Sequence, residues 1–224
     1  MGSPAHWPLF ELQVATDRLV LRPPTDDDLP GLLDATDAGI HDPNEMPFSI
    51  PWTDAEPQAR RIASLQHWWG NRANWKAEAW HLDLAVFLDG RPVGVQGMLA
   101  RNFAVLREVT TGSWLTRSVQ RQGIGREMRA AVLQLAFEGL GAQIARSGAF
   151  VDNPSSQAVS RAIGYRENGR SREAPRGTPK ELIGFELTRE EWSDNAGRFP
   201  RARITGLEKC IHMFLPEAET RSPR

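Results

Sequence analysis

The chain has 224 residues, of which 40% are hydrophobic and 25% charged, and 27 Lys and Arg face 28 Asp and Glu, for a formal net charge of −1. This composition is typical of a globular protein with a buried core, and it leaves no global basic field that would recruit nucleic acid. The single cysteine, Cys210, excludes an internal disulfide and a cysteine-rich zinc site and fits a cytoplasmic protein. No apolar run reaches the roughly 20 residues of a membrane span, and the N-terminus lacks a signal-peptide pattern.

The first elements expected along the chain are a strand and a helix. Residues 18–22 alternate apolar and charged side chains, as a half-buried strand does. Thr25 is a favourable N-cap, and Asp28 three residues later resembles the acidic member of a capping box. Leucines then recur at helical spacing, which predicts a helix over about 26–37.

A loop, a second helix and a hairpin are expected next. Residues 41–55 contain three prolines and show no period, and a long loop of this kind in a compact domain is usually functional or mobile. Apolar side chains along one side predict a helix over about 56–73. Two apolar runs, 81–88 and 93–99, flank an Asp-Gly pair, which is a strong hairpin signal.

The second half of the chain is expected to contain further strands and helices in mixed order. These are a strand over 108–116, a helix closed by Gly139, a strand over 144–151, a helix capped by Asn153, and a strand over 182–187. The order is not a strict strand–helix–strand alternation, so it predicts a mixed α/β or α+β sheet. We assign residues 1–190 to a single domain and residues 191–224 to a C-terminal extension, with one possible strand near 203–214.

The segment Gln120-Arg-Gln-Gly-Ile-Gly125 carries the clearest chemical signal because it lies between an expected strand and an expected helix. A glycine-rich turn at a helix N-terminus presents unpaired N–H groups and partial positive charge, which suits a pyrophosphate. The segment lacks the spacing of a Walker loop, and Met128 stands where a Rossmann fingerprint needs a third glycine.

Four motifs in order make the chain resemble the GNAT acetyltransferases, in particular the ribosomal-protein N-acetyltransferase branch. They are Gln120-x-x-Gly123-x-Gly125, the first strand Thr16–Pro23, Gly112-Ser-Trp-Leu115, and Asn153-Pro-Ser-Ser156 with Ala-Ile-Gly-Tyr165 after it. The resemblance covers about residues 15–190. The runs His41-Asp-Pro and Met46–Trp52 also resemble an actinobacterial subgroup in which one mycobacterial member is regarded as a succinyltransferase.

The resemblance implies a mixed central sheet with helices on both faces, splayed between the strands that flank the pyrophosphate loop. It implies an acyl-CoA-dependent N-acyltransferase in which an amine attacks the thioester directly, with acetyl-CoA or succinyl-CoA as co-substrate and no metal. Pantetheine would enter the gap as an added strand does. The positions that match the family's CoA contacts are Ser113, Trp114, Leu115, Gln120, Arg121, Gln122, Gly123, Ile124, Gly125, Arg126, Asn153 and Arg161.

The catalytic positions depart from common family patterns. Where many members have a tyrosine acid this chain has Ser160, and Thr110 stands at the position of the family's glutamate base. We therefore expect Ser156 to protonate or hydrogen-bond the leaving thiolate, and Glu108, on the same face of the strand as Thr110, to act as base through a water. Tyr165 is expected to pack in the core.

Several alternatives stay open. The missing glutamate and tyrosine also fit a non-catalytic acyl-CoA sensor. Residues His41, Asp42 and Glu45 of the long loop are expected near the amine. The acidic residues Asp42, Glu45 and Asp54 of this loop would suit a cationic acceptor, either a small molecule or a protein. Family habit predicts a homodimer. The near-zero net charge and the lack of a basic, aromatic-rich stripe argue against a nucleic-acid partner, and the lack of a long apolar run argues against a membrane partner.

Overall fold

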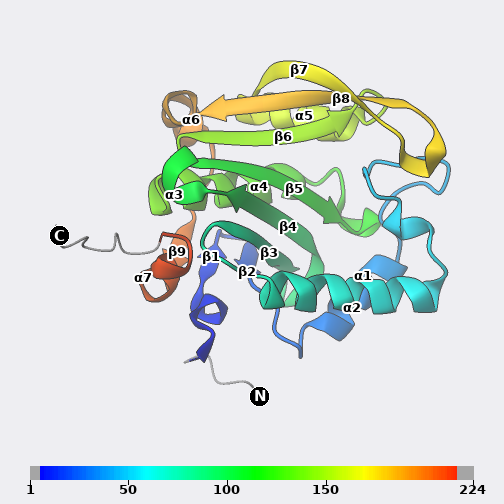
Figure 1. Ribbon diagram of the computed structural model, residues 1–224, viewed down its shortest axis with the longest axis horizontal. Coiled ribbons are helices and arrows are strands. Elements are labelled where there is room, and N and C mark those ends of the chain that lie inside the picture. Colours follow the sequence, from blue (N-terminus) through cyan, green and yellow to red (C-terminus); the bar gives the residue numbers. More distant parts are fainter. Residues whose placement is uncertain (1–5, 216–224) are drawn as a thin grey trace, which may run out of the picture.

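The computed structural model describes residues 6–215, which form one nine-stranded sheet with helices on both faces (Figure 1). The strand order is β7-β8-β6-β5-β4-β3-β2-β1-β9. The strands are β1 Gln13–Ala15, β2 Leu19–Arg22, β3 Ala79–Leu88, β4 Arg91–Arg101, β5 Glu108–Leu115, β6 Ile144–Phe150, β7 Arg166–Glu173, β8 Lys180–Thr188 and β9 Arg203–Thr205. All neighbouring pairs are antiparallel except β5 and β6, which run parallel.

The helices are α1 Leu29–Asp37, α2 Pro57–Ala73, α3 Phe103–Leu106, α4 Ile124–Gln134, α5 Pro154–Ile163, α6 Arg189–Asn195 and α7 Leu207–Cys210. Four of the helices, α1, α2, α4 and α5, form two layers on the sheet. Helices α1 and α2 cover the β2–β5 half of one face through a small apolar cluster that includes Leu29, Trp68 and Phe87. Helix α4 packs on the opposite face, where the main core gathers, with α5 beside it.

The parallel contact between β5 and β6 is short, and this determines where the site lies. Only Glu108↔Ile144, Val109↔Ala145 and Thr110↔Arg146 are paired, and the two strands then diverge, toward the right in Figure 1. Strand β5 stays paired with β4 as far as Leu115, and β6 stays paired with β8 as far as Phe150. The divergence therefore leaves two facing strand edges unpaired, as the resemblance implied.

Most of the expected elements are present, but one helix begins later than expected and several elements were not predicted. The first helix begins at Leu29, because Asp28 accepts hydrogen bonds from the Thr25 backbone and hydroxyl and pairs with Arg22, so Thr25 is not its N-cap. Strand β7 was not predicted, since its eight residues are almost entirely polar and exposed and carry no apolar alternation. The short strand β1, the capping-box helix α6 and the four-residue helices α3 and α7 were also missed.

The C-terminal segment belongs to the same sheet and core. Strand β9, three residues within the expected 203–214 range, pairs antiparallel with β1. Phe214 is fully buried, and its ring centroid lies 5.3 Å from that of Trp75 and 5.0 Å from that of Trp80. Tyr165 is buried in the main core, as expected. Within residues 6–215, no helix combines the length and the apolar character needed to cross a bilayer.

We expect the Phe214→Ala substitution to lower the free energy of unfolding by about 3–5 kcal/mol, because it removes a fully buried aromatic ring from a packed cluster. Chemical denaturation would measure the change. Ile211→Ala, at a position 37% exposed in the same segment, is the matched control and should cost much less. Equal losses for the two variants would show that the segment does not contribute through this cluster.

Candidate active site

The expected pyrophosphate loop forms a helix N-terminus without a side-chain cap. Gly123 is the N-cap of α4 and has a φ of 81°, and Arg121 before it has a φ of 61°. No side chain occupies the cap, so the first N–H groups of the helix are available to an anion. Arg121 and Arg126 are exposed beside them and add positive charge.

Side chains from three parts of the chain hold this loop in place. The Gln120 side-chain amide donates to the carbonyl oxygens of Ile40, at 2.7 Å, and Leu115, at 2.8 Å. Arg18 donates to the Gln122 carbonyl and forms an ion pair with Glu127 on α4. The side chain of Gln120 is therefore engaged in positioning the loop.

The facing edges of β5 and β6 open next to this helix. Thr111 Oγ1 donates to the Arg146 carbonyl oxygen at 3.2 Å, which closes the narrow end of the gap. The β4–β5 register is continuous from Gly94↔Leu115 to Leu99↔Thr110, so no bulge accompanies the opening in β5. Unpaired strand edges offer backbone donors and acceptors to an extended ligand, as in β-strand addition.

A buried arginine lies at the narrow end of the gap. Arg129 projects from α4, and its guanidinium donates to Ser113 Oγ on β5 (3.1 Å), Ser147 Oγ on β6 (3.0 Å) and Gln96 Oε1 on β4 (3.2 Å). It is 4% exposed, and within residues 6–215 it has no carboxylate partner. Burial lowers the pKa of Arg129, yet a guanidinium stays charged in proteins, so the site holds an unneutralised cation.

A cavity of about 370 Å³ lies on the other face of β3, β4 and β5, beneath the long loop and α2. Its walls are mostly apolar and aromatic, and they include Phe48, Ile50, Trp52, Ala63, Trp68, Val95, Leu99 and Trp114. Its polar groups include His67, His81 and Asp83. Ser113 lines this cavity and also accepts a hydrogen bond from Arg129. The cavity and the gap between β5 and β6 are therefore adjacent at Ser113.

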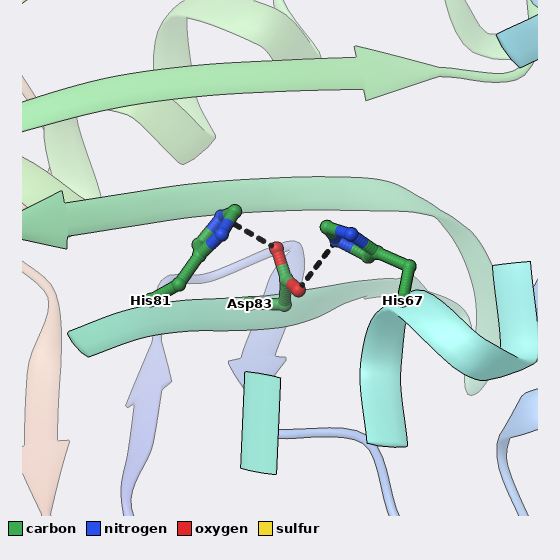
Figure 2. Close-up of side chains that lie close together, drawn as sticks. All are labelled: His67, His81 and Asp83. Atoms are coloured by element: carbon green, nitrogen blue, oxygen red, sulfur yellow. Dashed lines mark hydrogen bonds and ion pairs between the residues drawn. The ribbon is translucent and has the colours of Figure 1, made fainter. Parts of the chain in front are cut away.

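His67, Asp83 and His81 form a compact cluster in the cavity wall (Figure 2). Asp83 accepts from Nε2 of His67 at 3.1 Å and from Asn71 at 2.8 Å, and His81 Nε2 lies 3.3 Å from its other oxygen. Burial raises the pKa of Asp83, but the hydrogen bonds and charges of the two histidines outweigh it and hold that pKa well below its usual range. Burial lowers the pKa of His81, whereas Asp83 raises it, and the net shift is upward.

The same three side chains offer ligand atoms that all lie within 4.8 Å of one another, so the cluster has the donor types of a divalent-metal site. Without an ion, one oxygen of the Asp83 carboxylate accepts the hydrogen bonds from His67 and Asn71, and the other oxygen faces His81.

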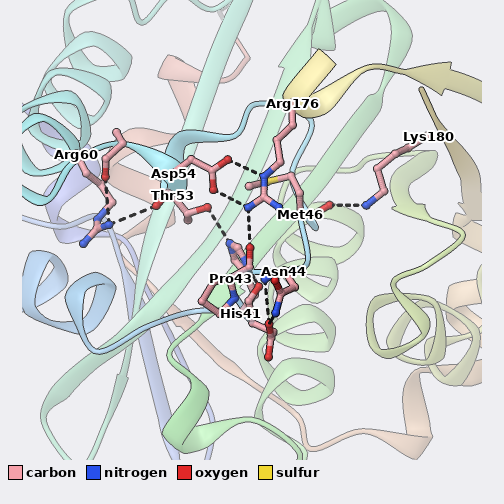
Figure 3. Close-up of polar contacts among 11 residues, drawn as sticks. His41, Pro43, Asn44, Met46, Thr53, Asp54, Arg60, Arg176 and Lys180 are labelled. Atoms are coloured by element: carbon pink, nitrogen blue, oxygen red, sulfur yellow. Dashed lines mark hydrogen bonds and ion pairs between the residues drawn. The ribbon is translucent and has the colours of Figure 1, made fainter. Parts of the chain in front are cut away.

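The long loop is fastened to the opposite half of the sheet (Figure 3). Arg176, in the turn between β7 and β8, donates twice to the Asp54 carboxylate at 2.6 Å and once to the Pro43 carbonyl at 3.0 Å. Lys180 at the start of β8 donates to the Met46 carbonyl at 3.0 Å. We call these contacts the clasp; they join the two halves across the open end of the gap.

The loop residues expected near the amine have local roles as well. His41 Nε2 lies 2.7 Å from Thr53 Oγ1, and Asp42 accepts from the Asn44 backbone at 2.9 Å. Glu45 is exposed. None of these three residues lines the cavity, whose loop wall consists of aromatic and apolar side chains.

Glu108 is engaged in an ion pair with Arg146 at 2.6 Å, and Arg146 also pairs with Glu186. Ser156 is half-buried near the start of α5, where its N–H donates to the Asn153 side chain at 3.2 Å. One turn later, Val159 lies 3.7 Å from a Cβ built on Gly125, so this face of α5 borders the loop. Arg161 pairs with Glu167, and the Asn153 side chain is the α5 cap.

Two strand residues expected to contact the cofactor face different sides. Trp114 lines the cavity, with its ring centroid 6.1 Å from that of Trp52, whereas Leu115 is buried in the main core. The residues that the sequence did not single out are Arg129, His67, His81 and Asp83. The i, i+2 spacing of His81 and Asp83 on a predicted strand was the one available signal, since it places both on one face.

Comparison with known proteins gives a consistent picture. The family description "Acetyltransferase (GNAT) domain" matches residues 18–166. A protein from Vibrio cholerae named as a ribosomal-protein-serine acetyltransferase is 25% identical, with 79% of this chain and 97% of that chain covered and a TM-score of 0.61.

Two further structures share the fold. RimJ from Mycobacterium smegmatis, in complex with CoA-disulfide, is 22% identical over 84% of this chain and 90% of that chain, with a TM-score of 0.68. RimL, a ribosomal L7/L12 alpha-N-protein acetyltransferase in complex with coenzyme A, is 18% identical over 77% and 95%, with a TM-score of 0.64.

We expect Arg176→Ala to release the loop, because the substitution removes three of the clasp hydrogen bonds. Amide hydrogen exchange over 41–55 should become faster, as it does where fewer contacts hold a segment closed. Arg170→Ala is the matched control, since Arg170 pairs with Glu181 within the same hairpin. Unchanged exchange, or the same change in both variants, would contradict the clasp.

Proposed function

Since the chain belongs to the GNAT acetyltransferase family and is an acyl-CoA-dependent N-acyltransferase, we propose that it transfers an acyl group ending in a carboxylate, such as succinyl, to an amine by direct attack on the thioester. One arrangement carries the transferase part of this proposal. The uncapped N-terminus of α4 stands beside the gap where β5 and β6 part, so groups suited to a phosphate and strand edges suited to an extended arm lie next to each other.

The donor would bind mainly through backbone. The first N–H groups of α4 would hold the pyrophosphate, with Arg121 and Arg126 beside it. The pantetheine arm would then hydrogen-bond to the free edges of β5 and β6. This would place the thioester carbonyl against β5, whose unpaired N–H groups are donors of the type that stabilise an oxyanion.

The reaction would be a direct transfer of the acyl group from the thioester sulfur to the amine nitrogen. A neutral amine attacks the thioester carbonyl, a C–N bond forms, and the carbonyl oxygen takes negative charge. As the intermediate collapses, the C–S bond breaks and the electron pair leaves on the thiolate of CoA. Ser156, on the face of α5 that borders the loop, would donate a hydrogen bond to that thiolate. Holding both reactants in line supplies much of the rate enhancement.

Arg129 supports an anionic acyl group. Its guanidinium donates to Ser113 on β5 and to Ser147 on β6, the two strands that border the gap, and all its acceptors among the described residues are neutral. A buried cation without an anion is costly, and a ligand carboxylate would supply the missing charge through strong, charge-assisted hydrogen bonds. An acetyl group would leave the cation unpaired.

Thermal unfolding with acetyl-CoA, succinyl-CoA and free CoA, compared at equal concentration, tests donor binding. Each ligand should raise the melting temperature by mass action, and succinyl-CoA should raise it most. Gly125→Asp, which puts a negative charge at the helix N-terminus, should abolish the shifts, whereas Gly197→Asp, at an exposed position outside the loop, should not. No shift with any CoA species would refute the transferase proposal.

We expect Arg129→Met to change the donor preference. The kcat/KM ratio of succinyl-CoA to acetyl-CoA should fall at least about tenfold, the lower end for a lost charge-assisted hydrogen bond. Because the ratio is taken within one variant, a general loss of stability cancels. An unchanged ratio would refute the anionic acyl group and leave the transferase assignment intact.

A further inference from the structure

The acceptor side of the site has a chemical character of its own. The cavity beside the gap is lined by aromatic and aliphatic side chains from the long loop, α2 and the sheet, and among residues 6–215 Asp83 is the one carboxylate that lines it. Asp54, one of the acidic residues of the long loop, forms an ion pair with Arg176, so its negative charge is already neutralised. An apolar cavity of about 370 Å³ favours an apolar body over a highly charged chain.

Two glycines connect this cavity to the thioester position. The register aligns Asp83 with Gly97 on β4 and Gly97 with Gly112 on β5, so the row that leads from Asp83 to the edge of the gap has no side chains. A Cβ built on Gly112 meets no atom within 4 Å. A Cβ on Gly97 would lie 3.3 Å from His81 Nε2. The open row leaves room for an amine between the His81–Asp83 pair and β5.

His81 is the better placed of the two histidines to act on that amine. It stands on the sheet, in register with Leu99 and, through Leu99, with Thr110, whereas His67 stands on α2 and is 49% exposed. The Nε2 atom of His81 faces Asp83, so the tautomer that donates Nε2–H to the carboxylate leaves a lone pair on Nδ1. Asp83 is itself held by Asn71 and His67, so it fixes the orientation of the ring.

The charges around His81 are few. Asp83 lies on its own strand, and His67 approaches from α2 with its ring centroid 5.4 Å away. Arg60, elsewhere in the cavity wall, is paired with Asp37, and the Glu108–Arg146 pair lies across the sheet on β5 and β6. Asp83 is therefore the dominant charge that acts on His81.

We propose that this cavity binds a primary amine carried on an apolar or aromatic body, and that His81, positioned by Asp83, is the general base that takes the proton from the amine nitrogen. The proposal rests on the acyl transfer proposed above and assigns its acceptor side. As the C–N bond forms, the N–H bond breaks, and the proton moves to Nδ1 of His81. The resulting imidazolium is stabilised by the Asp83 carboxylate until the proton is returned to solvent.

The pH profile is the first test, with thiol release from acetyl-CoA or succinyl-CoA as the assay and 2-phenylethylamine as the acceptor. His81 must be neutral to act, so kcat/KM should rise with pH through the pKa of His81. Asp83 raises that pKa, so Asp83→Asn should move this acid limb to lower pH, and His81→Gln should abolish it and lower kcat by roughly 10²–10⁴-fold. The exposed His212→Gln is the control, and its profile should match that of the unaltered protein.

The outcomes separate the two proposals. If the unaltered protein shows no melting shift with any CoA species, the transfer reaction itself fails. If the shifts are normal in all variants but the acid limb stays in place, only the assignment of His81 is overturned. Loss of activity with EDTA and its recovery with Zn²⁺ would show a metal centre at His67, Asp83 and His81 and would also overturn it. His81→Gln alters a partly exposed side chain, so it serves where Asp83→Asn fails to fold.

The acceptor class is tested with matched amines. Because an aromatic ring would be buried in the cavity, 2-phenylethylamine should have at least about tenfold higher kcat/KM than ethylamine. Gly112→Val should raise KM for 2-phenylethylamine more than for ethylamine, and Gly197→Val should change neither. Equal use of the two amines would overturn the apolar acceptor.

Discussion

The organisation of the molecule depends on the early separation of two parallel strands. Strands β5 and β6 share three residue pairs and then part, although β5 stays paired with β4 from Thr110 to Leu115 and β6 stays paired with β8 from Ile144 to Phe150. Backbone groups left unpaired inside a protein are unfavourable, so such a gap persists only where something else satisfies them. At the narrow end, Thr111 and Arg129 supply polar contacts to both strands, and further out the CoA arm would take their place.

In the proposed reaction the donor and the acceptor would be recognised by different means. The donor would bind to a helix N-terminus and to strand edges, which are backbone features whose position follows from the fold. The acceptor would bind in a cavity lined by side chains on the long loop, α2 and three strands. Side chains can be exchanged without disturbing the sheet, so one framework is compatible with many amines, and relatives with the same donor can differ in acceptor.

The parts that sequence predicted were those encoded locally. The loop Gln120–Gly125 is short, and its glycines indicate a turn before a helix. Apolar residues recur at helical spacing after it, so the loop and the helix were both predicted correctly. Strand β7 is polar throughout and forms because β8 pairs with it, which no local pattern indicates. His67 contacts Asp83 because α2 packs across β3, which the sequence does not indicate. Arg129 is a charged residue within a predicted helix, and its burial depends on the tertiary packing of that helix. The homodimer and the role of Ser156 remain predictions, and for the general base we now propose His81 in place of Glu108, which pairs with Arg146.

The clasp closes a ring of chain and hydrogen bonds at the open end of the gap between β5 and β6. The chain runs from α1 through the long loop to α2 on one half of the sheet, and the contacts of Arg176 and Lys180 fasten that loop to the hairpin of the other half. Covalent chain and hydrogen bonds together complete a ring around the open end of the gap. A compact amine or a free chain end can pass through a ring, whereas the middle of a folded polypeptide can enter only after the ring has been broken.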